Sequence, residues 1–204
     1  ALVYSPILAV LFAYRYLERR QFWIACPALL AVLAGLWMTS PNLQNKVTAA
    51  FTQYKLAQQG QETNSVGQRL ELWEKSIALF KSAPIIGHGT GSARVLLTRD
   101  APKLTDAPAI GNPHNQTLLF VIQWGILGAL ALYAMWIAHL MTFRGDGVVA
   151  WIGMMAVVQN ILSSLFNSHL SDFYQGWLYV LAVGIAAGTL RKTTDTQPRS
   201  PTTA

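Results

Sequence analysis

A histidine flanked by small polar residues stands directly before a long apolar run, in the stretch Asn112-Pro113-His114-Asn115. Asn112 is a preferred N-cap residue and Pro113 suits the first helical position, so the spacing predicts His114 in the first turn of a helix. The positive end of the helix dipole disfavours a protonated imidazole there, and a neutral histidine is what general-base chemistry needs. The alternative interpretation is a histidine that only hydrogen-bonds the helix start.

Three arginines are candidates for binding a phosphate group. The arginine side chain is a planar fork that bonds phosphate oxygens bidentately. Arg69 lies on a predicted helix, away from its apolar side, and Arg94 and Arg99 follow a glycine-rich turn. Each of them also fits a solvated surface arginine, because nothing in the sequence alone sets the direction of its side chain.

The other histidines carry weaker signals. The turn Gly87–Gly91 lacks the Lys-Ser/Thr pair of a P-loop and a preceding strand, so we interpret its His88 as structural. His139 falls near the inner end of a predicted helix, where a cation suits the dipole, and it has no catalytic role in this interpretation. His169 and Asp172 lie in a short polar turn that either joins the site or forms an ordinary connection.

Several reaction classes find no support in the sequence. There is no HExxH motif, no paired-cysteine site and no cluster of carboxylates in the long polar segment, so no metal is predicted. A G-x-S-x-G nucleophile elbow is also absent. The single Cys26 allows no intrachain disulfide. The net charge of +6 is scattered over the flanks of apolar segments and one loop, without the basic stripe that would indicate nucleic acid.

The composition predicts an integral membrane protein. The 204 residues are 52% hydrophobic and only 12% charged, whereas soluble domains have about 25% charged residues. A bilayer is spanned by roughly 20 helical residues. Five apolar segments reach or approach that length: residues 1–17, 22–38, 117–141, 148–166 and 173–190. We therefore predict an all-α membrane protein with about five transmembrane helices and one long, partly helical loop.

Basic residues set the predicted orientation in the membrane. They gather around the junction of the first two apolar segments, at Arg15, Arg19 and Arg20, and after the third and fifth, at Arg144 and at Arg191, Lys192 and Arg199. By the positive-inside rule all three places are cytoplasmic. The long connection, residues 39–116, and the short one, residues 167–172, then face outward.

This orientation divides the chain into four regions. They are residues 1–40 with two transmembrane helices, 41–116 as the outward loop with amphipathic helices, 117–190 with three transmembrane helices, and 191–204 as a disordered cytoplasmic tail. Within the loop, apolar residues at helical spacing predict one helix over Leu43–Tyr54 and a second from Ser65 to just before Pro84. The chain begins at Ala1 without a signal peptide, so we expect a fragment or a processed chain.

Two stretches, RLELWEKSIALFKSAPIIGHGTGS and PHNQTLLFVIQWGILGALALY, resemble the core of the O-antigen ligase and O-antigen polymerase superfamily. The shared features are an arginine leading a tryptophan-bearing helix, a Pro-then-Gly-x-Gly turn, a His-Asn-x-x-Leu segment that opens a span, and a following Gly-Ile-Leu-Gly. The closing NSHLSDFYQGWLYVLAVGIAAG also fits. The resemblance covers roughly residues 67–190 and corresponds to the C-terminal portion of the family, so the N-terminal half is expected to be missing here.

The resemblance implies a GT-C-like glycosyltransferase of the bacterial inner membrane, with several spans and its active face in the periplasm. Such an enzyme moves a glycan from undecaprenyl diphosphate to an acceptor and uses no cofactor. His114 corresponds to the histidine that activates the acceptor hydroxyl, and Arg69 to the arginine that holds the diphosphate. Arg94, Asn115 and His169 are further substrate-binding candidates.

Three kinds of acceptor share this donor chemistry. A ligase joins the glycan to lipid A–core, a polymerase extends repeat units on the carrier, and a protein O-oligosaccharyltransferase modifies a protein; His114 and Arg69 do not separate them. A transporter or flippase subunit is the rival from another class, but it would favour charges at mid-membrane and an inverted repeat, which the spans lack. We predict an O-antigen ligase, inverting because direct displacement inverts the anomeric centre.

Overall fold

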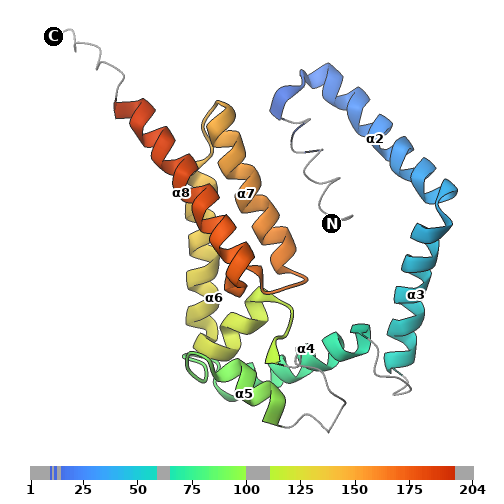
Figure 1. Ribbon diagram of the computed structural model, residues 1–204, viewed down its shortest axis with the longest axis vertical. Helices are drawn as coiled ribbons and strands as arrows, with labels where there is room; N and C mark the ends of the chain where they lie inside the picture. Colours follow the sequence, from blue (N-terminus) through green and yellow to red (C-terminus); the bar gives the residue numbers. More distant parts are fainter. Residues whose placement is uncertain (1–9, 11, 13–14, 59–64, 100–110, 196–204) are drawn as a thin grey trace. The chain divides into compact units, whose positions relative to one another are not determined.

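The computed structural model describes residues 10, 12, 15–58, 65–99 and 111–195, which form helices and turns with no strand among them. Figure 1 shows their order along the chain. The helices are α2 (Arg19–Thr39), α3 (Pro41–Gln58), α4 (Ser65–Ser82), α5 (Ser92–Arg99), α6 (Gln116–Thr142), α7 (Val148–Ser164) and α8 (Phe173–Asp195), with a 3₁₀ turn η2 (His169–Ser171) before α8. Contacts divide the chain into two units, Ala1–Glu74 with Pro102–Asp106 and Lys75–Ala101 with Ala107–Ala204.

The first unit contains α2 and α3, which meet at a short corner. The side chain of Gln44 closes this corner by donating from Nε2 to the Trp37 carbonyl at 2.7 Å. Pro41 begins α3, a position where its missing N–H leaves no hydrogen bond unmade. The helices predicted over 22–38 and Leu43–Tyr54 are confirmed, while the position of α3 on a membrane surface stays a prediction.

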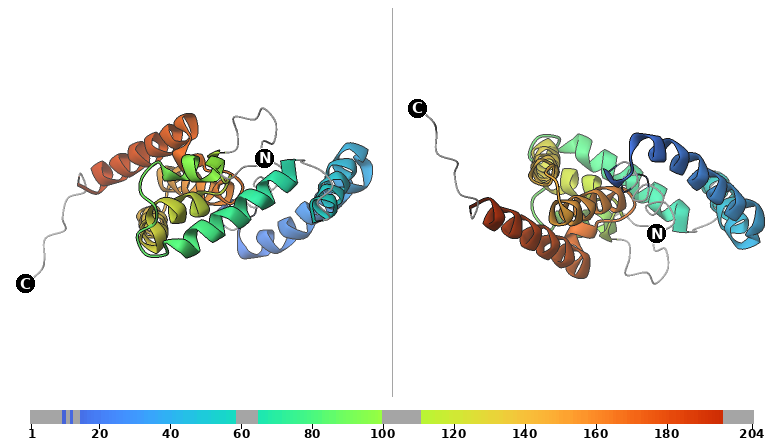
Figure 2. Two further views of the ribbon diagram at one scale, coloured as in Figure 1. Left: turned by 90° about the horizontal axis from the view of Figure 1, so that it is seen from below. Right: turned by 90° about the horizontal axis from the view of Figure 1, so that it is seen from above.

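The second unit is built on α6, α7 and α8, which lie side by side in Figures 1 and 2. Its buried core consists of Leu132, Trp136, Phe143, Val157, Tyr179, Val183 and Ala186. The core also contains a polar pair, in which Trp136 Nε1 donates to Asn160 Oδ1 at 3.0 Å. A buried polar group without a partner would cost about 1–3 kcal/mol, so this bond lets Asn160 remain inside the bundle.

Two of the described helices are long and apolar enough to cross a membrane, α6 and the Phe173–Lys192 part of α8. Two further apolar helices are shorter, α7 and the Leu30–Thr39 part of α2. The number of five spans stays a prediction, and its first segment lies largely outside the described residues. The tail prediction needs correction at its start, because α8 continues as a helix through Asp195.

Helix α6 is not straight, because Gly125 has non-helical backbone angles, φ 61° and ψ −152°. The two parts fold back on each other (Figure 1), and the hydroxyl groups of Thr117 and Tyr133 lie 3.0 Å apart. In a continuous helix, residues 16 positions apart would be separated by roughly 24 Å. The helix predicted over 117–141 is therefore present, but only the part after Gly125 runs straight along the bundle.

Candidate functional site

The start of α6 differs from its prediction. Asn115 is the N-cap, with extended backbone and with Oδ1 accepting a hydrogen bond from Leu118 N at 3.0 Å. The prediction of Asn112 as N-cap and Pro113 as first helical residue is wrong, and His114 precedes the helix instead of lying in its first turn. Asparagine caps well at either position, and here the oxygen of Asn112 is occupied by His114 N at 2.9 Å.

The backbone of His114 is held in an unfavourable conformation. Its φ is 50°, and among the described residues it is the non-glycine residue with a positive φ. A side-chain-bearing residue in this region costs on the order of 1 kcal/mol or more, so the surroundings must hold it there. Asn112 Oδ1 provides part of this support, and it also accepts a hydrogen bond from Ser168 Oγ at 2.7 Å. Strain of this kind clusters at functional sites.

The imidazole of His114 bonds to the loop between α7 and α8, with 3.0 Å between its Nδ1 and Asn167 Oδ1. The same oxygen accepts a hydrogen bond from Ser168 N at 3.0 Å, so it must be the amide oxygen and not the nitrogen. Nδ1 of His114 is therefore the donor. In the neutral ring the lone pair then lies on Nε2, the nitrogen that a general base would use.

Two further side chains tie the start of α6 to the same loop. Asn115 Nδ2 donates to the Leu165 carbonyl at 3.1 Å. Gln116 is fully buried; it donates from Nε2 to Ser171 Oγ at 2.9 Å and accepts from Leu170 N at 2.9 Å. We name residues 112–116 and 165–171, joined by these bonds, the His114 network. It connects two segments about fifty residues apart in the sequence.

A second group of contacts holds α6 at its break. Residues 84–91, named here the turn segment, bond to main-chain groups of α6 that the break leaves without helical partners. The bonds are Ile126 N to Pro84 O at 2.8 Å, His88 N to Ile122 O at 2.9 Å and Gly89 N to Gln123 O at 2.8 Å. The approach is so close that a Cβ on Gly87 would lie 2.5 Å from main-chain atoms of Gln123 and Trp124. Only glycine fits there.

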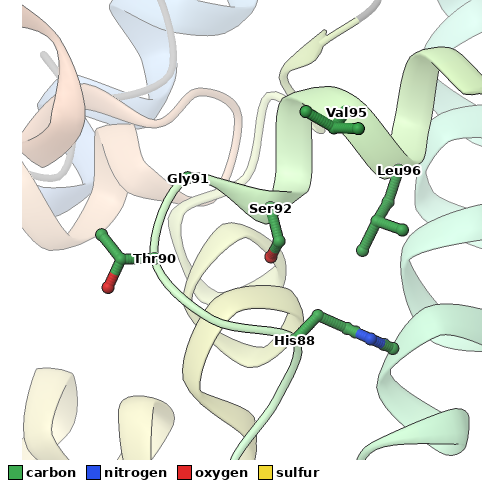
Figure 3. A pocket seen from close by; sticks show the side chains of 6 residues that line it. All are labelled: His88, Thr90, Gly91, Ser92, Val95 and Leu96. Atoms are coloured by element: carbon green, nitrogen blue, oxygen red, sulfur yellow. The ribbon is translucent and has the colours of Figure 1, made fainter.

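His88 supports the turn segment rather than a reaction. Its Nε2 lies 2.9 Å from the Leu79 carbonyl and 3.1 Å from Ser82 Oγ, both at the end of α4. This agrees with its predicted structural role. A hollow of about 440 Å³ lies beside it, lined by His88, Thr90, Gly91, Ser92, Val95 and Leu96. In Figure 3 the His88 ring and the Thr90 side chain point to opposite sides of the loop. No residue of the His114 network lines this hollow.

Of the three candidate arginines, Arg69 belongs to the first unit, and Arg94 and Arg99, both on α5, belong to the second. Arg94 is exposed on α5 in the same unit as His114, and its aliphatic stem lies against Gly111, where a Cβ would be 2.6 Å from Arg94 Cγ. This contact places α5 beside the residues that lead to His114. Arg69 is exposed on the part of α4 that belongs to the first unit.

His169 and Asp172 belong to the loop that carries the partner of His114, although the ring itself bonds to Asn167. The Nδ1 atom of His169 is buried without a hydrogen-bond partner. Burial lowers the pKa of His169, and the nearby carboxylate of Asp172 acts against this shift. Asp172 also accepts a hydrogen bond from Tyr174 N at 3.0 Å and so supports the start of α8.

Sequence reasoning missed the partners of His114. Asn167, Ser168 and Gln116 received no role, although a polar run between two apolar segments and a glutamine at the start of an apolar helix were visible signals. Within the described ranges, no three His, Cys, Asp or Glu side chains come together in a way that could hold a metal ion.

A family model described as O-antigen ligase matches residues 1–133, well over half of the chain. The chain belongs to the O-antigen ligase family, whose members are membrane glycosyltransferase-like enzymes of the ligase and polymerase type. The matched residues include Arg69, Arg94 and His114 and end before Asn167, so the expected resemblance over 134–190 stays a prediction.

An uncharacterized protein of Haemophilus influenzae (strain ATCC 51907 / DSM 11121 / KW20 / Rd) is 25% identical over 129 residues. These residues cover 60% of this chain and 32% of that protein. The chain thus spans about a third of the length of the curated relative that it matches.

Proposed function

We propose that the protein transfers a glycan from undecaprenyl diphosphate to lipid A–core, as an O-antigen ligase at the periplasmic face of the bacterial inner membrane. The family supports the donor chemistry, and the ligase reaction is the member of that class that we favour. The reaction needs a base for the acceptor hydroxyl and positive charge for the diphosphate, and it needs no metal or nucleotide.

One observation carries this proposal: the bond from His114 Nδ1 to Asn167 Oδ1 leaves Nε2 as the proton-accepting atom. A neutral imidazole with one nitrogen held by a hydrogen bond and the other free has the protonation state that a general base requires. The ring stands on a strained residue before α6, a cost that a purely capping histidine would not explain.

In the proposed step the acceptor oxygen attacks the anomeric carbon of the glycan while His114 Nε2 takes its proton. The bond from that carbon to the diphosphate oxygen breaks, and undecaprenyl diphosphate leaves with the electron pair. Negative charge then grows on the diphosphate, which Arg94 and Arg69 would neutralise. Direct displacement on the face opposite the leaving group inverts the anomeric centre.

The distribution of charge supports chemistry at one membrane surface. Helices α6 and α7 contain no Asp, Glu, Lys or Arg, and α8 contains none before Arg191. A transport pathway would favour such residues at mid-membrane. We place the loop with Asn167 at the periplasmic surface, because Arg144, Arg191 and Lys192 mark the opposite ends of the same helices as cytoplasmic. His114, bonded to that loop, then lies where lipid headgroups reside.

The test is glycan transfer by the full-length protein carrying His114→Ala, in membranes supplied with carrier-linked glycan and lipid A–core. We expect a loss of about 10²-fold or more, the usual contribution of a general base. His139→Gln, at the other end of α6, is the matched control and should retain transfer. The readout is the lipopolysaccharide ladder on a gel, normalised to the amount of protein.

Two results would overturn this proposal in different ways. If His114→Ala keeps wild-type transfer, the histidine is only a structural residue. If the unaltered protein makes no ladder and instead lengthens the carrier-linked glycan, the protein is a polymerase. Arg69→Ala, Arg94→Ala and Arg99→Ala, made separately, test which arginines contribute to the diphosphate site.

A further inference from the structure

We propose that Asn167 is a positioning residue for His114, whose amide oxygen selects the imidazole tautomer that leaves Nε2 free to take the acceptor proton. This inference rests on the proposed function and adds a residue that the family match does not contain, because that match ends at residue 133. It concerns the loop between α7 and α8.

The orientation of the Asn167 amide is set by the main chain. Its Oδ1 accepts from Ser168 N at 3.0 Å and faces His114 Nδ1 at 3.0 Å. If the amide were turned over, its NH₂ group would face the N–H of Ser168, donor against donor. The amide therefore presents an acceptor to the ring, and the ring must donate from Nδ1. The alternative tautomer would lose this bond and place the proton on Nε2.

The next residue in the loop holds the backbone of the same histidine. Ser168 is 1% exposed and donates from Oγ to Asn112 Oδ1 at 2.7 Å, the atom that accepts from His114 N. Two consecutive residues thus set the tautomer and the unfavourable φ of His114. Because Ser168 is shielded from water, solvent does not replace its bond to Asn112, the residue that accepts from the backbone N–H of His114.

The charge of the partner matters as much as its geometry. A carboxylate bonded to Nδ1 would strongly stabilise the protonated ring, whereas a neutral amide orients the ring and stabilises the cation far less. Ionisable groups on neighbouring described segments include His169 and Asp172 of the same loop, Tyr174 at the start of α8, Tyr133 of α6, and Arg94 of α5, whose stem lies against Gly111. The last turn of α7 and the first turn of α6 contribute only uncharged groups. Asn167 therefore directs the ring without placing a negative charge on its Nδ1 side.

The experiment measures single-turnover transfer by the full-length enzyme, with carrier-linked glycan and lipid A–core, across the pH range around 6.5, the usual histidine value. Asn167→Asp keeps the shape but introduces a carboxylate. The rate should begin to fall at higher pH than in the wild type, by about one pH unit, because the base becomes protonated sooner. The transfer rate of Asn167→Ala should be about 10- to 100-fold lower than that of the wild type, which is part of the contribution of the base.

Two controls separate positioning from stability. Asn160→Ala removes a buried asparagine that bonds to Trp136, so it should lower stability and leave the pH profile in place. Ser168→Ala releases Asn112 but keeps the ring bond, so it should lower the rate without moving the profile. Rates are expressed per folded enzyme, which keeps a partly unstable variant informative.

The outcomes for Asn167 and His114 are distinguishable. If His114→Ala is inactive while Asn167→Asp keeps the wild-type pH profile, or Asn167→Ala the wild-type rate, the positioning role is overturned and the base survives. If His114→Ala remains active, the proposed function fails and this inference fails with it. A shifted profile for Asn167→Asp together with an inactive His114→Ala supports both.

Discussion

Helix α6 is held at two places, by main-chain bonds at Gly125 and by side-chain bonds at His114. At the break, the turn segment supplies carbonyl and N–H groups to residues 122–127 of the helix. In the His114 network, the bonds come mainly from the side chains of Asn112, Asn115, Gln116, Asn167 and Ser168. The same helix thus depends on backbone shape at one place and on side-chain chemistry at the other.

This difference indicates which substitutions should alter folding and which should alter stability and chemistry. Main-chain bonds do not depend on the type of side chain. At the break, only the two points of close approach, Gly87 and Gly125, require a particular residue, because a Cβ would clash there. A side-chain network depends on particular amides and hydroxyls, and a single replacement removes a donor or an acceptor. We expect changes at the break to alter folding as a whole, and changes in the network to alter stability and chemistry together.

Gly125→Ala should have the largest effect. The backbone angles at Gly125 lie in a region open essentially to glycine alone, and a Cβ would meet the carbonyl of Ile85. We expect the free energy of unfolding to fall by about 3 kcal/mol or more, which is a large part of the stability of a marginally stable protein. The measurement is the amount of full-length protein in membranes. Gly184→Ala, with nothing within 4 Å of its Cβ, is the control and should accumulate normally. Normal levels of Gly125→Ala would refute the bend.

Gln116→Met should have the second largest effect on stability. The change keeps the length of a fully buried side chain but removes the acceptor of Leu170 N and the donor to Ser171 Oγ. An unpaired buried group costs about 1–3 kcal/mol, so the thermal midpoint of the purified protein should fall. Gln159→Met, at an exposed position of α7, serves as the control. Equal midpoints for the two variants would mean that the network does not stabilise the start of α6.

Thr90→Val should have a smaller effect on stability, and it tests whether side chains as well as main-chain groups hold the break at Gly125. Its hydroxyl accepts from Trp124 Nε1 at 3.0 Å, a side-chain bond at an exposed site. Losing it should cost about 0.5–1 kcal/mol and leave transfer unchanged, because the main-chain bonds remain. Thr98→Val, whose hydroxyl bonds only within α5, is the comparison. A large loss of protein from Thr90→Val would show that side chains also hold the break.

The smallest effect is expected from the pH dependence of His169. Burial lowers its pKa from 6.5, so the neutral form is favoured by folding. The stability linked to this group is complete above about pH 6.5 and is lost as the pH falls below that value. His169→Gln should make the thermal midpoint less sensitive to acid, by less than about 2 °C. If acid lowers the midpoint of both proteins equally, another group is responsible.

Local patterns predicted much of the secondary structure. The segment 148–166 is α7, which ends at Ser164, and the helix expected from Ser65 to just before Pro84 is α4. Such elements follow from apolar length and from proline and glycine at the ends. The cap of α6 was misplaced by three residues, because Asn112 and Asn115 are equally good caps and only the contact with the His114 backbone N–H decides between them.

The site was also predicted only in part, because its contacts join segments that are distant in the sequence. His114 stood out because an ionisable residue before an apolar run is unusual, and the membership of the chain in the O-antigen ligase family is confirmed. Its role as a base, and those of Arg69 and Arg94, stay predictions. Asn167 was not singled out, since a polar turn between two helices has many explanations until the fold shows which side chain it meets.

The sequence by itself determined the apolar helices, the polar loop between them and the histidine at the start of α6, because length, hydropathy and local spacing act on neighbouring residues. Only the tertiary structure decided that α6 bends at Gly125 and that His114 donates to Asn167. Both depend on segments distant in the chain, the turn segment in one case and the α7–α8 loop in the other. A glycine inside an apolar run is compatible with a straight helix until another main chain bonds at its break, and a histidine has no fixed tautomer until a partner is present.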